Sequence, residues 1–448
     1  TSVVVAEVTP LQVPIGEMVE GLACASDPSQ TYTLYVPSTY TREGRHPVLL
    51  VFDPRGRSLL AAELFQDAAE TYGWIIVSSD NTRSASSWEP NLRAIRALWP
   101  EVHSRLPADS ERIYAAGFSG GVAVATLLAR STGGVAGIIG CGGLNIANQP
   151  TEGTVPFFLT AGNADFNFSE MHGLEDFLAE LGNSHRLVIF EGPHTWMPPE
   201  VAREAVEWME LIAMQRGKRE RDPGLIDALY AKDLARAKML AAEGHVLVAA
   251  RRLREMERTY EGLHDISAAR EAADRIESGD RFRTQKKQLR RAMAYEARCL
   301  ERQNSELAIL RSSDVPPPTH QLAGTLQIRN LTRNAAKPGE EGLAAQRCLN
   351  SLYSTLAFYF PLVDLPKKRY AQVAVSYELA NMVRDDNPVV WYNLACVRAL
   401  LGRKNDAVRA LARALEHGFN NSELLATDAD LDSLRKREDF KVLMAERP

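Results

Sequence analysis

The 448-residue sequence lacks the long apolar runs and the basic excess that mark membrane and nucleic-acid-binding proteins. No stretch approaches the roughly 20 apolar residues that a membrane-spanning helix needs, so no span is expected. The formal net charge is −5, and a nucleic-acid partner is therefore not expected either. One basic segment lies at residues 281–291, and the acidic residues on both sides of it favour a solvated helix face.

Cysteine is scarce and shows no paired spacing. The chain has five cysteines, none in a C-x-x-C pair, so neither a zinc site nor a thioredoxin-like redox site is indicated. No metal and no organic cofactor are expected. An odd number of cysteines at wide spacing also argues against a disulfide framework. A single Cys24–Cys141 bridge stays open, and buried free thiols are the favoured interpretation.

The chain changes character near residue 218. Before it, short apolar runs rich in β-branched residues alternate with stretches of helical periodicity, which predicts a mostly parallel, doubly wound α/β domain at residues 1–218. The expected strands are residues 31–37, 47–53, 74–80, 112–117, 135–140, 156–161 and 186–190. The expected helices are residues 59–72, 91–106, 121–130 and 170–181.

Residues 219–448 are rich in helix formers and predict an all-α domain. Helix-stopping glycines and prolines interrupt it at positions 244, 262, 279, 315–318, 337–339, 366 and 388. Residues 387–419 carry small and apolar side chains where a tetratricopeptide repeat packs its two helices, at Trp391, Leu394, Ala395, Ala407, Leu411 and Ala414. Weaker copies of the pattern lie at residues 373–380 and 237–253. We therefore predict a tetratricopeptide-like array, closed by a cap near the C-terminus.

One motif in the first half carries nucleophilic chemistry. The sequence Gly117-Phe118-Ser119-Gly120-Gly121 follows an expected strand and opens an expected helix. A G-x-S-x-G motif in this context is typical of a nucleophile elbow, in which small residues flank a serine on a sharp turn. The helix N-terminus beneath it also favours developing negative charge. Ser119 is therefore the predicted nucleophile, and the alternative is a glycine-rich turn with an incidental serine.

Two later loops supply a matching acid and base. A triad of this type needs the chain order Ser, Asp, His, with the acid and the base each following a later strand. Asp165 follows the expected strand 156–161, and His194 follows the expected strand 186–190. Parallel strands end at one edge of a sheet, so the two side chains should meet there. The other candidate acids and bases lie in or beside helical runs: His103, Glu170, His172, Glu175, Asp176 and His185. Glu191 is at a strand end but is too near His194 in sequence to orient it easily.

An acyl-transfer site also needs two N–H donors aimed at the developing oxyanion. Gly120 directly follows the nucleophile and provides one backbone donor. The loop after the expected strand 47–53 should provide the other. Pro54 in that loop has no N–H group, so the predicted second donor is the amide of Arg55.

Three aromatic residues are candidates for the walls of a substrate pocket. Phe118 lies inside the elbow, Trp196 follows His194 by two residues, and Trp88 lies in the loop after the expected strand 74–80. Flat apolar side chains at a site mouth suit aromatic or sugar-ring substrates. The alternative is that each of them fills local core.

The segments YTLYVPSTY, PVLLVFDPRGR, GFSGG and EGPHTWMPPE resemble, in this order, small bacterial α/β-hydrolases over residues 15 to 215. The resemblance extends to polyhydroxybutyrate-depolymerase-like and feruloyl or acetyl-xylan esterase-like enzymes, in which a Trp often follows the catalytic His. It implies a serine esterase whose triad is Ser119, Asp165 and His194. Many relatives carry His-Gly where this chain has Asp53-Pro54, a departure that bears on the second oxyanion donor.

These features predict an enzyme that cleaves small-molecule or polymer-attached carboxylic esters through an acyl-enzyme. Two alternatives stay open: a serine peptidase with the same triad, and an inactive scaffold that binds a protein through its repeats. The helical half is expected to bind a protein partner or to cover the active site. The chain starts at Thr1 rather than Met, which, with the secreted habit of similar esterases, favours a periplasmic or secreted protein over a cytoplasmic one.

Overall fold

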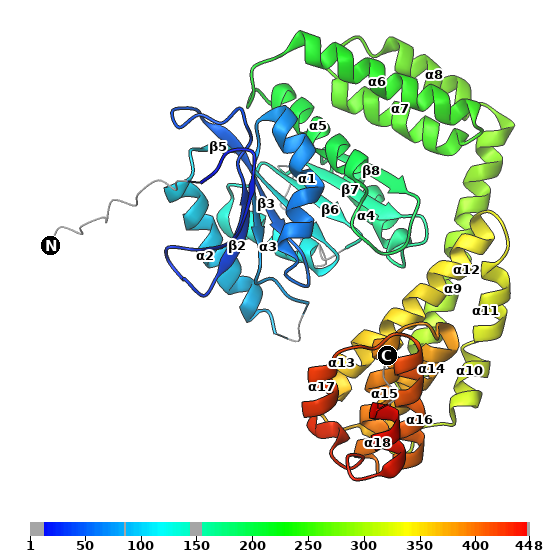
Figure 1. Ribbon diagram of the computed structural model, residues 1–448. Coiled ribbons are helices and arrows are strands. Elements are labelled where there is room, and N and C mark those ends of the chain that lie inside the picture. Colours follow the sequence, from blue (N-terminus) through cyan, green and yellow to red (C-terminus); the bar gives the residue numbers. More distant parts are fainter. Residues whose placement is uncertain (1–12, 85–86, 144–154, 446–448) are drawn as a thin grey trace. The chain divides into compact units, whose positions relative to one another are not determined.

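The computed structural model describes residues 13–84, 87–143 and 155–445, and it divides into two compact units (Figure 1). The first unit is Thr1–Lys287 and the second is Gln288–Pro448. Among the described residues, no helix combines the length and the apolar character that crossing a bilayer requires. All five cysteines are buried and free, as predicted, and Cys24 and Cys141 are not bridged.

An eight-stranded sheet forms the centre of the first unit. In space the strands follow the order β1-β2-β4-β3-β5-β6-β7-β8. The pairs β1–β2 and β2–β4 are antiparallel and all other pairs are parallel. The strand bounds are β1 Met18–Ala23, β2 Thr31–Tyr35, β3 His46–Phe52, β4 Ile75–Ser79, β5 Ala108–Phe118, β6 Gly137–Cys141, β7 Phe157–Gly162 and β8 His185–Phe190.

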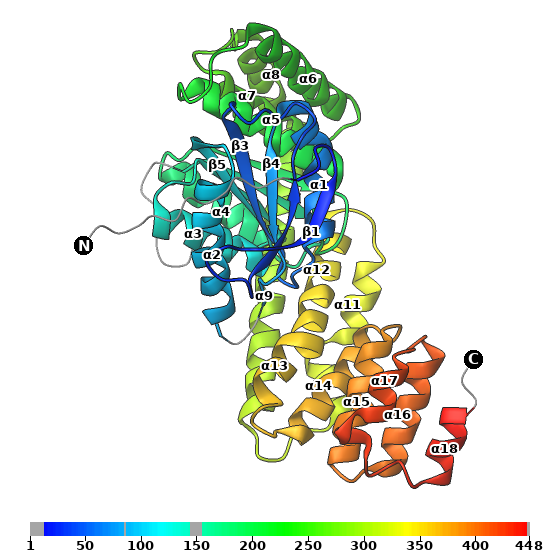
Figure 2. The same ribbon diagram turned by 60° about the vertical axis from the view of Figure 1, so that its left-hand side comes forward.

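Helices cover both faces of this sheet, which confirms the predicted α/β fold class. Figure 2 shows α1 (Ser58–Tyr72) on one side and α2 (Glu89–Arg105) and α3 (Gly120–Thr132) on the other. Because its side chains alternate between two covered faces, β3 is apolar from Pro47 to Phe52. Leu50 packs with the layer of α2, α3 and α4 (Phe168–Glu180), whereas Leu49 packs with the layer of α1 and α5 (Pro199–Gln215).

Three more helices belong to the first unit: α6 (Pro223–Ala242), α7 (Val246–Tyr260) and α8 (Ser267–Glu277). They share a buried apolar cluster with the end of α5, to which Leu211 and Met214 contribute. The indole N–H of Trp208 on α5 also donates to Thr259 on α7 at 3.0 Å. The last strand, β8, ends at Phe190 and α5 ends at Gln215, whereas the compact unit continues to Lys287. The boundary at residue 218 therefore stays a prediction.

The second unit is helical, as the prevalence of helix formers predicts. Its elements are α9 (Asp280–Ser312, which begins in the first unit), α10 (Thr319–Thr325), α11 (Ile328–Ala335), α12 (Glu340–Ser354), the π-helical turn η1 (Thr355–Tyr359), α13 (Phe360–Asp364), α14 (Tyr370–Val383), α15 (Pro388–Leu400), α16 (Lys404–Glu416), α17 (Ser422–Thr427), η2 (Ala429–Leu431) and α18 (Glu438–Ala445). Leu394 and Ala395 on α15 and Leu411 on α16 are buried in one cluster. A tetratricopeptide identity for this helix pair stays a prediction.

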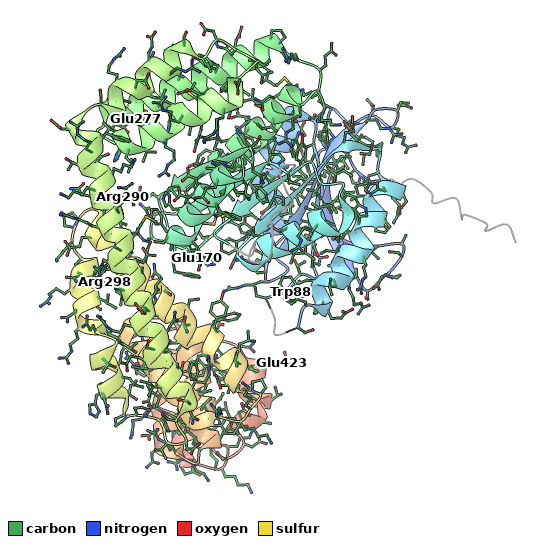
Figure 3. All side chains as sticks on the ribbon, turned by 180° about the vertical axis from the view of Figure 1, so that it is seen from behind. Trp88, Glu170, Glu277, Arg290, Arg298 and Glu423 are labelled. Atoms are coloured by element: carbon green, nitrogen blue, oxygen red, sulfur yellow. The ribbon has the colours of Figure 1, made fainter. Side chains whose placement is uncertain are left out.

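The basic segment at residues 281–291 lies on α9. All six of its lysines and arginines are exposed, as expected for a solvated helix face. Figure 3 shows Arg290 and Arg298 on this helix.

Candidate active site

Ser119 lies at the point where β5 ends and α3 begins. Its backbone has φ +50° and ψ −121°, a conformation that residues other than glycine rarely adopt. The turn brings α3 so close to β3 that a Cβ atom on Gly121 would lie 1.9 Å from the carbonyl oxygen of Phe52. This is the strained strand–turn–helix geometry that a nucleophile elbow requires.

The side chains of Ser119, His194 and Asp165 form one hydrogen-bonded chain. Nδ1 of His194 lies 2.9 Å from Oδ1 and 3.0 Å from Oδ2 of Asp165, and Nε2 lies 3.0 Å from Oγ of Ser119. When Nδ1–H donates to the carboxylate, Nε2 is left as the acceptor for the Ser119 hydroxyl. The Asp165 side chain is fully buried, whereas 18% of the His194 side chain is exposed.

The loops that carry the acid and the base are tied together by hydrogen bonds. The amide of Asn163 donates to the carbonyl of Phe190 at 2.8 Å, and that of Ala164 donates to the carbonyl of Gly192 at 2.9 Å. In return, the Gly192 amide donates to the side-chain oxygen of Asn163 at 3.2 Å. These bonds fix the separation of the two loops, and with it the position of the imidazole relative to the carboxylate.

Two residues that sequence reasoning missed hold Asp165 in place. The Asn167 amide donates to Oδ1 of Asp165 at 2.8 Å, and the Asn167 side chain donates to the Gly142 carbonyl at 2.7 Å. Gly142 has φ +55°, and a Cβ atom there would lie 2.6 Å from Oδ2 of Asp165 and 3.2 Å from Nδ1 of His194. Only glycine therefore fits at position 142 without displacing the acid.

Two phenylalanines pack against the imidazole. The ring centroid of Phe118 lies 4.7 Å from that of His194, and the ring centroid of Phe166 lies 4.1 Å from it. Phe118 is only 6% exposed. Phe118 was predicted from the elbow as a pocket wall, and in the structure it contacts the base itself. Nothing in the amino-acid sequence pointed to Phe166 except its place next to Asp165.

The two predicted tryptophans have different surroundings. Trp196 is 7% exposed, packs edge-on against Phe65, and donates its indole N–H to Oδ2 of Asp53 at 2.8 Å. Trp88 is 45% exposed and directly precedes α2 at the surface (Figure 3). These contacts favour a packing role for Trp196. Substrate binding by either residue stays a prediction.

The predicted oxyanion donors also differ from each other. Gly120 is the first residue of α3, where a helix leaves its N–H groups without an intrahelical partner. The amide of Arg55, by contrast, donates to Oδ1 of Asp53 at 2.8 Å. The prediction that Arg55 supplies the second free amide is therefore not matched by this geometry. The physical reason is an aspartate side chain that bonds its own backbone two residues on.

Asp53 is a buried anchor for this loop. Besides the amide of Arg55 and the indole of Trp196, it accepts two bonds from the guanidinium of Arg57, at 3.1 and 2.7 Å. Burial by itself would raise the pKa of Asp53, but the hydrogen bonds from Arg57, Trp196 and the Arg55 amide outweigh it and leave the pKa below its usual value. Asp53 therefore remains an ionised acceptor near neutral pH.

Three other titratable groups of the first unit, His172, His185 and Cys141, are buried. His172 is buried 3.3 Å from Glu175, and burial lowers the pKa of its imidazole. His185 is buried with Nδ1 2.7 Å from the carbonyl of Asn183. Burial, assisted by the charge of Asp165, raises the pKa of the Cys141 thiol well above its usual value. A buried thiol in that state is a poor nucleophile.

A separate group of buried charges lies between β8, α5, α6 and α7. We call it the Arg186 cluster; it consists of Arg186, Glu204, Asp233, Arg252 and Glu255. Arg186 pairs with Glu204 at 3.3 Å and Asp233 at 3.2 Å, and Arg252 pairs with the same two carboxylates at 2.9 and 2.7 Å. Glu255 lies 3.9 Å from Nε of Arg186 and accepts from the Leu187 amide at 3.3 Å.

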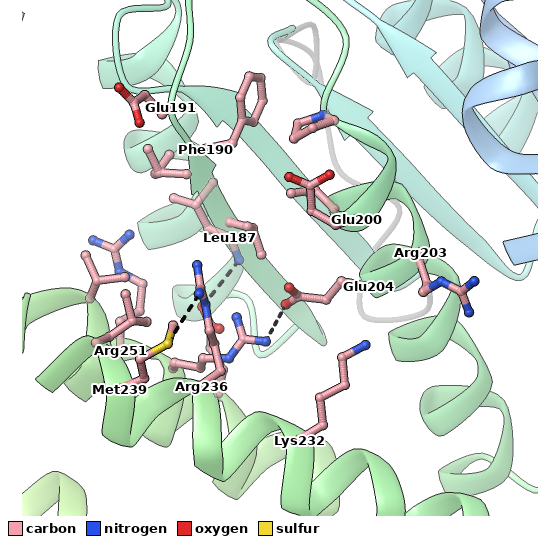
Figure 4. Close-up of a pocket in the computed structure, with 18 of the residues that line it drawn as sticks. Leu187, Phe190, Glu191, Glu200, Arg203, Glu204, Lys232, Arg236, Met239 and Arg251 are labelled. Carbon is pink, nitrogen blue, oxygen red and sulfur yellow. Dashed lines mark hydrogen bonds and ion pairs between the residues drawn. The ribbon is translucent and has the colours of Figure 1, made fainter. Parts of the chain in front are cut away.

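This cluster borders a cavity of about 890 Å³ (Figure 4). The cavity is lined by Leu187 and neighbouring residues of β8, by the start of α5, and by residues such as Met239 and Arg251 on α6 and α7. None of the three triad residues lines it. The cavity and the candidate active site are therefore distinct features of the first unit.

Among the described residues, one group of side chains has the spacing of a metal site. Cys396, Asp428 and Asp430 in the second unit bring their ligand atoms within 4.8 Å of one another. Asp428 already accepts from the hydroxyl of Tyr392 at 2.5 Å, and burial raises the pKa of the Cys396 thiol above its usual value. A protonated thiol and an engaged carboxylate are poor metal ligands.

Comparisons with known proteins give likenesses of fold only. The solved structures that resemble the chain include S-formylglutathione hydrolase from Staphylococcus aureus, with a TM-score of 0.36 and 14% identity over 45% of this chain and 99% of that one. An esterase from Pyrobaculum calidifontis matches with a TM-score of 0.35 and 17% identity, over 45% and 85% of the two chains. Acylaminoacyl peptidase from Pyrococcus horikoshii matches with a TM-score of 0.32 and 14% identity, over 45% and 41%. No family model and no curated protein sequence matches the chain.

Proposed function

We propose that this protein is a serine hydrolase that cleaves carboxylic esters through an acyl-enzyme. The observation that carries the proposal is the unbroken hydrogen-bonded chain from Oγ of Ser119 through His194 to Asp165, set on a strained elbow. An incidental serine in a glycine-rich turn would have no reason to share this geometry with a buried acid and a partly exposed imidazole.

In the proposed reaction, Nε2 of His194 takes the hydroxyl proton of Ser119 while Oγ bonds to the ester carbonyl carbon. The alcohol leaves with that proton, and an acyl group remains on Ser119. Water then gives a proton to His194 and attacks the acyl carbon. The bond from the acyl carbon to Oγ breaks as His194 returns that proton to Oγ, which releases the carboxylic acid and restores Ser119. Asp165 holds the imidazole in the required tautomer and stabilises its charged form. No cofactor takes part in these steps.

An activity-based label tests the catalytic assignment directly. A fluorophosphonate should modify the full-length protein once, at Ser119, because only an activated serine attacks phosphorus at a useful rate. Ser119→Ala should remain unlabelled, and the exposed Ser87→Ala should label like the wild type. If intact wild-type protein fails to label, it is an inactive scaffold and the proposed function is wrong.

Substrate panels separate an esterase from a peptidase. We expect turnover of p-nitrophenyl esters, feruloyl esters and acetyl-sugar esters, compared at equal concentration with matched aminoacyl anilides. Esters need less leaving-group activation than amides, so a plain esterase should prefer them by several orders of magnitude. Comparable rates on the anilides would instead favour the peptidase.

We further propose that the helical second unit binds a protein partner or limits access to the active site. The helix pair α15–α16, which the sequence predicts as a tetratricopeptide-like repeat, supports a binding role, since arrays of such repeats present extended surfaces. Removing residues 288–448 tests this better than a cut at residue 218, because Leu211 and Met214 are buried against α6–α8. A fragment with unchanged preference across the ester panel would remove the proposed effect on access.

A further inference from the structure

Residues 54–57 of the loop after β3 offer no unengaged backbone amide for an oxyanion. Pro54 has no N–H group, and the Arg55 amide donates to the Asp53 carboxylate. The amide of Gly56 donates to the Asp53 carbonyl at 3.1 Å, and the amide of Arg57 lies 3.4 Å from Oδ1 of Asp53. Since the hydrogen bonds from Arg57 and Trp196 keep Asp53 ionised, these amides stay engaged near neutral pH.

A hydroxyl from a different loop lies next to Gly120. A Cβ atom on Gly120 would lie 2.4 Å from Oγ of Ser84, so Ser84 occupies the space directly beside the first residue of α3. The same position is 3.7 Å from Cβ of Pro54. Gly120 is the residue whose amide is the first predicted oxyanion donor, at the start of α3. Its lack of a side chain leaves room for the Ser84 hydroxyl at the site.

Ser84 is fixed in this position by its neighbours. Its amide donates to the Pro54 carbonyl at 2.8 Å. The buried hydroxyl of Thr82 donates to the Asp53 carbonyl at 2.8 Å. Asn91 on α2 accepts from the amide of residue 83 and donates to its carbonyl, both at 2.9 Å. Preorganised donors of this kind stabilise developing charge because they need no reorganisation during the reaction.

We propose that the Ser84 hydroxyl is the second oxyanion donor and acts with the amide of Gly120. The proposal rests on the proposed hydrolase function and names a catalytic residue that the elbow, the acid and the base do not reveal. In the proposed role the Ser84 hydroxyl turns its proton toward the substrate oxygen, and no bond between described residues engages Oγ of Ser84 in the structure. A side-chain donor from the loop after β4 thus takes the place of an amide from the loop after β3.

Ser84→Ala in the full-length protein tests this assignment. We expect kcat on a small ester to fall about 10²-fold with KM changed less than about 3-fold, because the bond forms only as negative charge develops on the oxygen. The melting temperature should not change. The matched control is Ser87→Ala, which removes an exposed hydroxyl from the same loop and should leave both constants unchanged.

A second readout distinguishes transition-state stabilisation from a structural effect. Wild type should hydrolyse an oxoester much faster than the matching thionoester, because sulfur is the poorer hydrogen-bond acceptor. Ser84→Ala should narrow that ratio and slow fluorophosphonate labelling of Ser119 in step with kcat. A Ser84→Ala variant within 3-fold of wild type in kcat, or with an unchanged oxo-to-thiono ratio, would overturn the proposal. Wild-type protein that neither labels nor turns over would instead overturn the hydrolase function, and this assignment with it.

Discussion

The first unit buries two polar clusters that differ in what their groups are free to do. The Arg186 cluster joins β8, α5, α6 and α7 through ion pairs, and its members lie on regular strands and helices. The triad lies on loops at the carboxyl ends of β5, β7 and β8, and Ser119 is the one described non-glycine residue of this unit with positive φ. Buried charge alone therefore does not mark a catalytic site. The site proposed as catalytic differs from the Arg186 cluster in backbone strain and in the partial exposure of Ser119 and His194.

The largest expected effect is on turnover, at the triad. Ser119→Ala should lower kcat on any accepted ester about 10⁴-fold or more, equivalent to over about 5 kcal/mol of transition-state stabilisation. The free energy of unfolding should stay the same or rise, because the substitution removes one hydroxyl at a strained position and no packing contact. Steady-state kinetics and denaturant unfolding of the same preparation measure both quantities. Residual activity above about a tenth of wild type would mean that another residue is the nucleophile.

Substitution in the Arg186 cluster should lower the free energy of unfolding and leave kcat unchanged. Arg186→Met leaves Arg252 as the one remaining guanidinium within the Arg186 cluster for its three carboxylates, so we expect about 3–5 kcal/mol of lost stability. Five of the six tryptophans lie in the first unit, and their fluorescence during urea unfolding reports the change. Arg42→Met, at an exposed loop position, is the control and should be neutral. Any surviving folded Arg186→Met protein should keep its kcat. A selective loss of kcat at unchanged stability would contradict the contrast between the two clusters.

The cluster also predicts how stability depends on pH. Burial raises the pKa of Glu255 to about 7; Arg186, Arg251 and Arg252 oppose this rise, and Glu175 adds to it. Because the folded-state pKa exceeds the ordinary 4.5, the protonated form stabilises the fold at low pH. That contribution, on the order of 3 kcal/mol, is lost as pH rises from about 4.5 through 7.

Glu255→Gln isolates this effect. Its amide oxygen can still accept from Leu187, but its charge no longer changes with pH. The variant should therefore match wild type at pH 4.5 and exceed it in unfolding free energy at pH 8. Parallel stability curves for the two proteins between these values would show that Glu255 is already ionised at low pH.

The sequence predicted the parts of the fold that depend on local pattern. Seven strands were found because both faces of each are covered, which produces continuous apolar runs. β1 was missed because it is a mostly exposed edge strand that contains Gly21 at φ +68°. The positions of Ser119, Asp165 and His194 followed from their places at strand ends. That the three side chains meet in space could be predicted without distant contacts, because parallel strands end at the same edge of the sheet.

The rest depends on contacts between residues far apart in the chain. The bond between Trp196 and Asp53 spans 143 positions, and the Arg186 cluster combines four elements, so neither has a local signal. The engagement of the Arg55 amide is different. An Asp-Pro-Arg-Gly sequence is typical of a turn in which the aspartate bonds its own backbone, and this pattern could have excluded Arg55 as a free donor.

The smallest expected effect separates packing from substrate contact at Trp196. Trp196→Phe keeps the ring against Phe65 but removes the N–H bond to Oδ2 of Asp53, which still accepts from Arg57. We expect a loss of about 1.5 kcal/mol in unfolding free energy, at the low end for a bond to a charged group. Turnover of acetyl and feruloyl esters should fall by the same small factor. The substitution removes a bond to Asp53, in the loop after β3 that positions Ser84, and it leaves any contact with the acyl group unchanged. Trp88→Ala, at a 45% exposed position, is the stability control and should leave unfolding unchanged. A selective loss on the feruloyl ester, about tenfold or more, would show instead that Trp196 reaches the substrate.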